Sequence, residues 1–210
     1  MDSVARFIDL VGEPSPPLDR AALALAAGAE PALDEARWLA ELDRLATGVD
    51  GLDALVHRLF VQERFAGNNE DYYDPRNSLL PHVLTRRLGI PITLAVVCIE
   101  VGRRAGIALH GVGMPGHFVV AHFGADPPIV IDPHSGGRPL PRALEPSLVR
   151  PWSAHEIAMR MLNNLVHAYT RALDVGSAIH AARLRLLLPA ARAHRTALTQ
   201  ELRALEARLN

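Results

Sequence analysis

The segment RRLGIPITLAVVCIEVGRRAGI, residues 86–107, places the strongest constraint on the fold of this chain. Residues 92–105 carry a wide apolar face, which predicts a buried helix. Arg103 and Arg104 stand in its last turn and Gly106 follows, as the helix dipole and a left-handed C-cap favour. Three short β-like runs come next, IALHGVG, HFVVAHF and PIVID, separated by the turn-forming sequences MPG and GADPP. A helix followed by an antiparallel meander predicts an α+β core.

Helices are expected on both sides of this core. The sequences EPALDEARWLAELDRLA and DGLDALVHRLFVQERF repeat apolar residues at helical spacing, and Asp50 is the expected N-cap of the second. Residues 155–189 predict two helices with a break at Asp174 to Gly176, and TALTQELRALEARL predicts a third. The first two look like one tetratricopeptide-type hairpin, which must pack on the core because a solenoid needs about three repeats. We expect three regions: N-terminal helices packed on the core (1–64), the core (65–150) and a tetratricopeptide-like helical tail (151–210).

Composition and charge exclude several classes of function. A chain of 210 residues can bury one substantial core. The net charge of −1 gives no electrostatic reason to expect nucleic acid or an anionic membrane as a partner. All 22 basic residues are arginine, which excludes Schiff-base chemistry on a lysine and a lysine-based phosphate loop. Cys98 is the single cysteine, and no apolar stretch approaches the ~18 residues of a membrane span, so a cytoplasmic protein is expected.

A polar connector with two tyrosines, FAGNNEDYYDPRNSLL, covers residues 65–80. Its density of Asn, Asp, Gly and Pro favours turns, which would hold Tyr72, Tyr73, Asn77 and Ser78 on a loop. Loops of this kind often line binding sites, so these four residues are the predicted ligand contacts. The alternative is a surface connector held by Asx-turns.

Three residues are candidates for chemistry: Thr93, His117 and Asp132. Thr93 falls in the first turn of the predicted helix, where outward backbone N–H groups and the dipole favour a nucleophile or an oxyanion. His117 opens one predicted strand and Asp132 closes the next. If the strands are antiparallel neighbours, the two side chains come within hydrogen-bonding distance. Asp132 would then fix the imidazole tautomer while His117 acts as general base or acid.

These motifs carry a resemblance. The sequences YYDPRNSLLPHVLTRRLGIPITL, GVGMPGHFVVAHF and IVIDPHSGG look like the SirB family, a bacterial branch of the transglutaminase-like superfamily with a papain-like core. The resemblance implies a cysteine at a helix N-terminus followed by a histidine and an aspartate on successive strands. His117 and Asp132 match the last two, but the cysteine position falls at or very near Thr93.

The replacement of cysteine by threonine argues against thiol chemistry. A thiol with a pKa of ~8.5 is readily ionised at a helix N-terminus, whereas a threonine hydroxyl is far less acidic and an internal threonine has no α-amine as its base. Cys98 lies five positions further, on another face of the helix, and is expected to be a small core residue. Thr93 as a cap or packing residue, and His117 as a structural histidine, remain open alternatives.

A metal site is the rival chemistry, because His110, His117, His122 and His134 lie within a short stretch. On a regular strand His117 and His122 point to opposite faces, so a shared ion would need a bulge. We therefore expect no metal and no cofactor.

Three functions are compatible with this sequence. The first is a non-catalytic or weakly catalytic module that binds a peptide, protein or small amide in a papain-like cleft, with a regulatory role. The second is a hydrolase or acyltransferase using Thr93, His117 and Asp132. The third is an interaction module acting through the C-terminal helices. A protein or peptide partner is expected, nucleic acid and membrane are not, and the sequence does not predict an oligomeric state.

Overall fold

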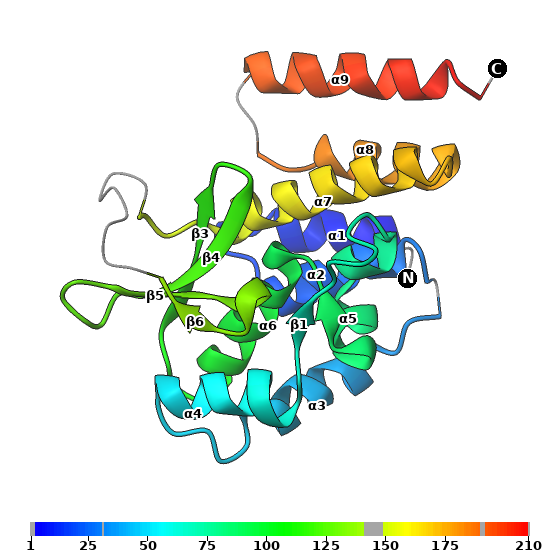
Figure 1. The fold of residues 1–210 in the computed structure, drawn as a ribbon. Helices are drawn as coiled ribbons and strands as arrows, with labels where there is room; N and C mark the ends of the chain where they lie inside the picture. The colour runs from blue at the N-terminus through cyan, green and yellow to red at the C-terminus, as the bar shows by residue number, and fades with distance from the viewer. Residues whose placement is uncertain (1–2, 31, 141–148, 190–191, 210) are drawn as a thin grey trace.

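The computed structural model describes residues 3–30, 32–140, 149–189 and 192–209. Helix α6 lies near the centre of the molecule, with an antiparallel sheet on one side and the other helices around it (Figure 1). The fold is therefore α+β, with helical extensions before and after the core, as predicted. The α-helices are α1 Ser3–Val11, α2 Leu18–Ala27, α3 Glu35–Ala46, α4 Leu52–Val56, α5 Leu80–Arg86, α6 Pro91–Arg104, α7 Ala154–Arg171, α8 Val175–Arg185 and α9 Arg192–Glu206. The strands are β1 Ala66–Gly67, β2 Leu88–Gly89, β3 Leu109–Met114, β4 His117–His122, β5 Ile129–Asp132 and β6 Arg138–Pro139.

The ends of α6 follow from its sequence. Pro91 occupies the first helical position, where its missing N–H costs nothing. At the other end Gly106 has a φ of 75°. The N–H of Ile107 donates to the carbonyl of Gly102 at 2.8 Å, and the N–H of Gly106 donates to the carbonyl of Arg103 at 3.3 Å. These two bonds form a Schellman motif, which confirms the predicted glycine C-cap.

The sheet has the order β3-β4-β5-β6, and all three pairings are antiparallel. One face of β4 and β5 contributes Phe118, Val120 and Ile131 to the main core beside α6. On the other face Val119 belongs to a smaller apolar cluster with residues of β3 and β5. Because both faces are covered, β4 is almost continuously buried from Phe118 to Ala121, as its unbroken apolar sequence indicates.

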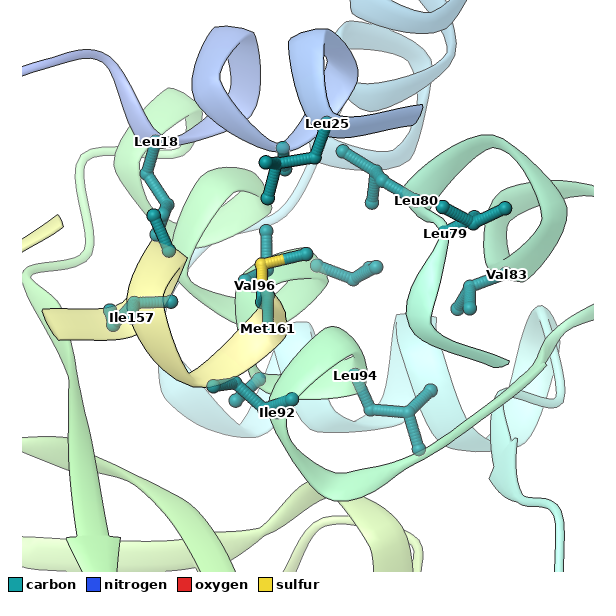
Figure 2. Close-up of a cluster of buried hydrophobic side chains, with 14 of the residues drawn as sticks. Leu18, Leu25, Leu79, Leu80, Val83, Ile92, Leu94, Val96, Ile157 and Met161 are labelled. Atoms are coloured by element: carbon teal, nitrogen blue, oxygen red, sulfur yellow. The ribbon is translucent and has the colours of Figure 1, made fainter. Parts of the chain in front are cut away.

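The main core joins elements that are far apart in the chain. Figure 2 shows side chains of α2, α5, α6 and α7 meeting around Val96 and Met161. Both residues are fully buried. The N-terminal and C-terminal helices therefore share one core with α6, and the division at residues 64 and 150 remains a prediction.

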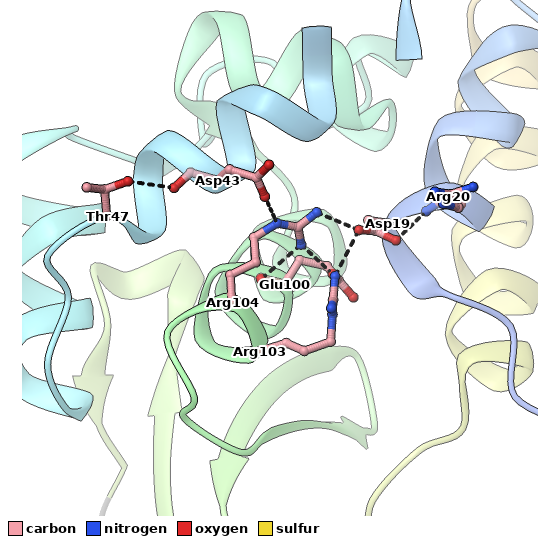
Figure 3. A network of polar contacts seen from close by, with 7 residues as sticks. All are labelled: Asp19, Arg20, Asp43, Thr47, Glu100, Arg103 and Arg104. Atoms are coloured by element: carbon pink, nitrogen blue, oxygen red, sulfur yellow. Dashed lines mark hydrogen bonds and ion pairs between the residues drawn. The ribbon is translucent and has the colours of Figure 1, made fainter. Parts of the chain in front are cut away.

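A buried ionic network ties the C-terminal end of α6 to α2 and α3 (Figure 3). The guanidinium of Arg104 contacts Asp19 at 2.6 Å, Asp43 at 2.7 Å and Glu100 at 2.7 Å. Although burial opposes ionisation, the hydrogen bonds from Arg104 hold the pKa of Asp19 below its usual value. Burial and the neighbouring Asp19 charge raise the pKa of Glu100. Asp19 is thus the ionised partner that fixes α2 on α6.

Some local expectations need correction. The N-cap of α4 is Gly51, with a φ of 88°, and not Asp50. Helix α4 continues into a π-helical turn, His57–Gln62, which spacing alone does not distinguish from α-helix.

The break between α7 and α8 is where it was predicted, because Asp174 caps α8 by accepting from the N–H of Ser177 at 3.0 Å. No described helix combines the length and the apolar composition that a membrane crossing requires.

Candidate functional site

His117 stands at the start of β4, directly after a tight hairpin turn. Met114 pairs with His117 across this turn, and Gly116 takes a φ of 68° that a side chain would disfavour. The side chain of His117 is 32% exposed. Its ring therefore lies at the end of the sheet and remains accessible to a ligand.

Asp132 ends β5 and lies beside His117. The register of β4 and β5 pairs Val120 with Ile131, so continuing it by one residue sets Asp132 opposite Val119 and diagonal to His117. The Nε2 atom of His117 lies 3.0 Å from Oδ2 of Asp132. The predicted proximity of these two side chains is therefore present, while the predicted catalytic role remains a prediction.

The carboxylate of Asp132 is held by four hydrogen-bond donors from three residues. Besides His117, the Ser135 hydroxyl donates to Oδ2 at 2.7 Å, and the N–H groups of His134 and Ser135 donate to Oδ1 at 3.0 and 3.3 Å. Burial alone would raise the pKa of Asp132, but the bonds from Ser135 and His117 outweigh it and hold the pKa below its usual value. An ionised carboxylate only accepts, so the proton of the neutral imidazole is on Nε2 and Nδ1 is an acceptor.

Thr93 lies in the first turn of α6, as predicted, but inside the protein. Its exposed fraction is 0%, and Oγ1 has no hydrogen-bond partner among the residues that the structure describes. A buried hydroxyl without a partner is uncommon and costs free energy. Thr93 therefore does not present its hydroxyl to solvent in this conformation. Cys98 is also buried, and burial raises the pKa of its thiol far above its usual value.

His134 is a neighbour of the His117–Asp132 pair. The sequence suggested His134 only as a metal ligand. Its ring lies perpendicular to that of His117, with centroids 6.4 Å apart. The ring packs on Gly67 of β1, where a Cβ atom would come within 2.3 Å of Nε2. Burial lowers the pKa of His134, which favours the neutral form of the ring. Its Nε2 atom is buried without a hydrogen-bond partner in the described part of the chain.

The four predicted ligand contacts lie in two environments. Tyr72 and Tyr73 are 40% and 44% exposed, with ring centroids 5.3 Å apart. Tyr72 also lies 6.2 Å from the His134 ring, which brings it to the His117 site. Asn77 and Ser78 are buried in the 3₁₀ turn Pro75–Ser78.

The amide of Asn77 is used inside the protein. It donates to the carbonyls of Asp71 at 2.7 Å and Tyr72 at 3.2 Å, and its oxygen accepts from Asn68 at 3.1 Å. Its backbone carbonyl also accepts from the N–H of Ile90 at 3.3 Å. Asn77 therefore shapes the tyrosine loop and joins it to the residue before α6.

Arg160 of α7 is another neighbour of the pair, and sequence analysis did not select it. Its guanidinium donates to the carbonyl oxygens of His117 at 3.0 Å and Met114 at 3.4 Å, on the two sides of the hairpin turn. The positive charge also stabilises the phenolate form of Tyr72, although burial keeps the pKa of Tyr72 above its usual value. No local sequence signal identifies Arg160, because its contacts cross more than forty positions of the chain.

The histidines do not form a metal centre within the described ranges. Across residues 3–30, 32–140, 149–189 and 192–209, no group of three or more His, Cys, Asp or Glu side chains has an arrangement that could hold a metal ion. His110 contacts Phe123 at 5.6 Å between ring centroids, and Nδ1 of His122 lies 3.0 Å from the carbonyl of Ala108. These contacts separate both rings from the His117–Asp132 pair.

Comparison with known proteins identifies the family of this core. A family model described as "Transglutaminase-like superfamily" matches residues 22–163. A UPF0162 protein of Xylella fastidiosa (strain 9a5c) is 50% identical over 105 residues, which are 50% of this chain and 37% of that protein. A UPF0162 protein of Pseudomonas aeruginosa is 35% identical over 149 residues, covering 66% of this chain and 54% of that protein.

The relatives also include a eukaryotic protein, which matches a shorter part of the chain. F-box only protein 21 of Mus musculus is 42% identical over 69 residues, 33% of this chain and 11% of that protein. The chain thus spans at most about half the length of these curated relatives. No solved structure matches it.

Proposed function

Because the chain belongs to the transglutaminase-like superfamily, we propose that it is a binding module of that superfamily which holds an amide-type ligand at the His117–Asp132 pair without a covalent step. The ligand is a peptide, a segment of a protein or a small amide. The assignment to the SirB branch and a regulatory role are part of this proposal.

The burial of Thr93 carries the proposal. A nucleophile must reach about 3–3.5 Å from the carbonyl carbon that it attacks. The hydroxyl of Thr93 has no exposed surface, whereas the His117 side chain is 32% exposed. A ligand can therefore contact the imidazole while the hydroxyl stays out of reach.

The polarity of the pair favours an amide. In the neutral form of the imidazole, Nε2 donates to Asp132 at 3.0 Å and Nδ1 is an acceptor. Peptide and side-chain amide N–H groups are the matching donors. Tyr72, which lies 6.2 Å from the His134 ring, adds an aromatic surface at the edge of the same site.

The hydrolase hypothesis is the second candidate, because the His117–Asp132 bond is the arrangement that a general base requires. In that reading Thr93 becomes exposed when substrate binds, or His117 activates water. The hypothesis that the C-terminal helices bind a partner by themselves also stays a prediction.

The test is a titration of ¹⁵N-histidine-labelled protein with the neutral pentapeptide acetyl-Ala-Ala-Gln-Ala-Ala-amide. The His117 ring signals are expected to shift with added peptide, and mass spectrometry is expected to find the peptide intact after a day. His117→Ala should abolish binding. His110→Ala, which removes an exposed histidine on the neighbouring strand, should not.

Two outcomes would contradict the proposal. If no ring signal of His117 responds to any accessible peptide concentration, the pair is not a ligand site. If the peptide is cleaved and Thr93→Val abolishes the cleavage, the hydrolase hypothesis is correct. Cleavage that survives Thr93→Val but not His117→Ala would assign the reaction to water.

A further inference from the structure

We propose that Arg160 is the anion-recognising residue of this site, and that the bound peptide carries a carboxylate beside the amide that His117 accepts. The inference rests on the proposed function, because it names what the same site recognises. The carboxylate belongs to an acidic side chain of the peptide.

The hydrogen bonding of Arg160 leaves donors available. A guanidinium has five N–H donors, and the two bonds to the hairpin carbonyls of Met114 and His117 occupy two of them. The charged group also lies 5.6 Å from the Phe118 ring centroid and 5.8 Å from that of Trp152. These contacts hold the guanidinium in place, so little conformational entropy is lost when a ligand binds to it.

Arg160 has no carboxylate partner among the described residues, although it is half-buried. Other half-buried arginines have a carboxylate partner. Arg86 contacts Asp74 at 3.2 Å. Arg87 contacts two glutamates, and Arg104 contacts three carboxylates. Burial without a counter-charge lowers the pKa of Arg160, which means that an anion placed there would be favourable.

The carboxylates of Asp132 and Glu156 already have partners. Asp132 binds His117 and Ser135. Glu156, one helical turn before Arg160, binds the Arg150 guanidinium at 2.6 Å and the N–H of Ser153 at 2.8 Å. Neither of these two carboxylates is therefore the counter-ion of Arg160.

Arg160 also lines a groove that can hold a peptide. The groove has a volume of about 720 Å³ and lies between α7 and the two residues Pro189 and His194. Besides Arg160 it is lined by Trp152, His155, Asn163, Asn164 and His194. Among the described residues that line it, the one acidic side chain is Glu156, which Arg150 neutralises. The charge of the groove is therefore complementary to an acidic peptide.

The experiment compares two peptides that differ in one group, acetyl-Ala-Ala-Glu-Ala-Ala-amide and the glutamine peptide used above. Both are titrated by ¹H–¹⁵N NMR, which reports the Trp152 indole and the His117 ring. We expect the glutamate peptide to bind about tenfold more tightly, because hydrogen bonds to a charged group are stronger than neutral ones. The preference should decrease with added salt.

Variants assign the preference to Arg160. Arg160→Met should remove it, and Arg160→Lys, which keeps the charge but not the planar fork, should reduce it. Arg58→Met is the matched control, since Arg58 also donates to a backbone carbonyl, that of Thr47 at 3.2 Å. The Arg58→Met variant should keep the full preference for the glutamate peptide. If Arg160→Met does not fold, Arg160→Lys decides.

The outcomes separate this inference from the proposed function. Equal affinity for both peptides, with shifts at His117, would overturn the role of Arg160 and leave the binding proposal intact. No shift at His117 or Trp152 with either peptide would overturn both. A preference that survives both Arg160 variants would overturn the assignment to this residue. Glu145 lies outside the described residues and is tested by Glu145→Gln. If this variant binds the glutamate peptide tenfold more tightly, Arg160 pairs with the chain's own carboxylate, which also overturns the inference.

Discussion

Replacement of Thr93 by valine should stabilise the protein. The hydroxyl of Thr93 is fully buried and has no partner among the described residues. A buried polar group without a hydrogen bond costs about 1–3 kcal/mol. Valine has nearly the same shape, and its χ1 rotamer is similarly restricted. Thr93→Val should therefore raise the free energy of unfolding by about 1 kcal/mol, allowing for imperfect repacking.

The assay is urea denaturation followed by circular dichroism, with the m-value monitored to confirm that only stability changes. In thermal unfolding the same gain corresponds to a rise of about 2–4 °C in Tm for a chain of this length. The matched control is Thr85→Val, because the Thr85 hydroxyl donates to the Pro81 carbonyl at 2.9 Å. The control should be neutral or destabilising. A loss of 1 kcal/mol or more in Thr93→Val would refute the reasoning, since it would show that the Thr93 hydroxyl has a partner.

Three further predictions follow from buried groups. The thiol of Cys98 should not react with Ellman's reagent in the native protein, because burial raises its pKa. It should react fully in 6 M guanidinium, where the chain is unfolded. A rapid reaction of the native protein would contradict the burial of Cys98 in α6. Arg104→Met should destabilise by about 3 kcal/mol, since the buried Asp19 carboxylate then keeps only the exposed Arg103 guanidinium at 3.1 Å as its cationic partner. A change below about 1 kcal/mol in urea denaturation would contradict this. Asp132 has a lowered pKa, so its contribution to stability is complete above the unfolded value of 3.8 and decreases as the pH falls below it. Asp132→Asn should therefore be less stable than the wild type at pH 7, and the difference should shrink at pH 2 to 3; a difference independent of pH would refute the ionised state of Asp132.

The central part of the fold could be predicted because its signals are local. The apolar face, the terminal arginines and Gly106 specified α6 within one or two residues at each end. The prolines and glycines between the apolar runs specified the β3–β4 hairpin. The proximity of His117 and Asp132 then followed from antiparallel pairing alone.

The rest of the site depends on contacts between distant parts of the chain. The side chain of Asn77 looked like a ligand contact because its neighbours favour a loop, but tertiary packing buries it and uses its amide internally. The role of Gly67 as the surface on which His134 packs appears only when β1 meets the turn after β5. Arg160 of α7 reaches the hairpin from more than forty positions further along the chain, a contact that helical periodicity does not encode.

The most direct test of the account is a crystal structure with acetyl-Ala-Ala-Glu-Ala-Ala-amide bound. The account predicts a peptide N–H within about 3.2 Å of Nδ1 of His117 and the glutamate carboxylate within about 3.2 Å of the Arg160 guanidinium. Thr93 should remain buried, with no peptide carbonyl carbon within about 3.5 Å of its hydroxyl. A peptide bound away from His117, or a carbonyl carbon in contact with the Thr93 hydroxyl, would contradict the central claim that this site binds an amide without a nucleophile.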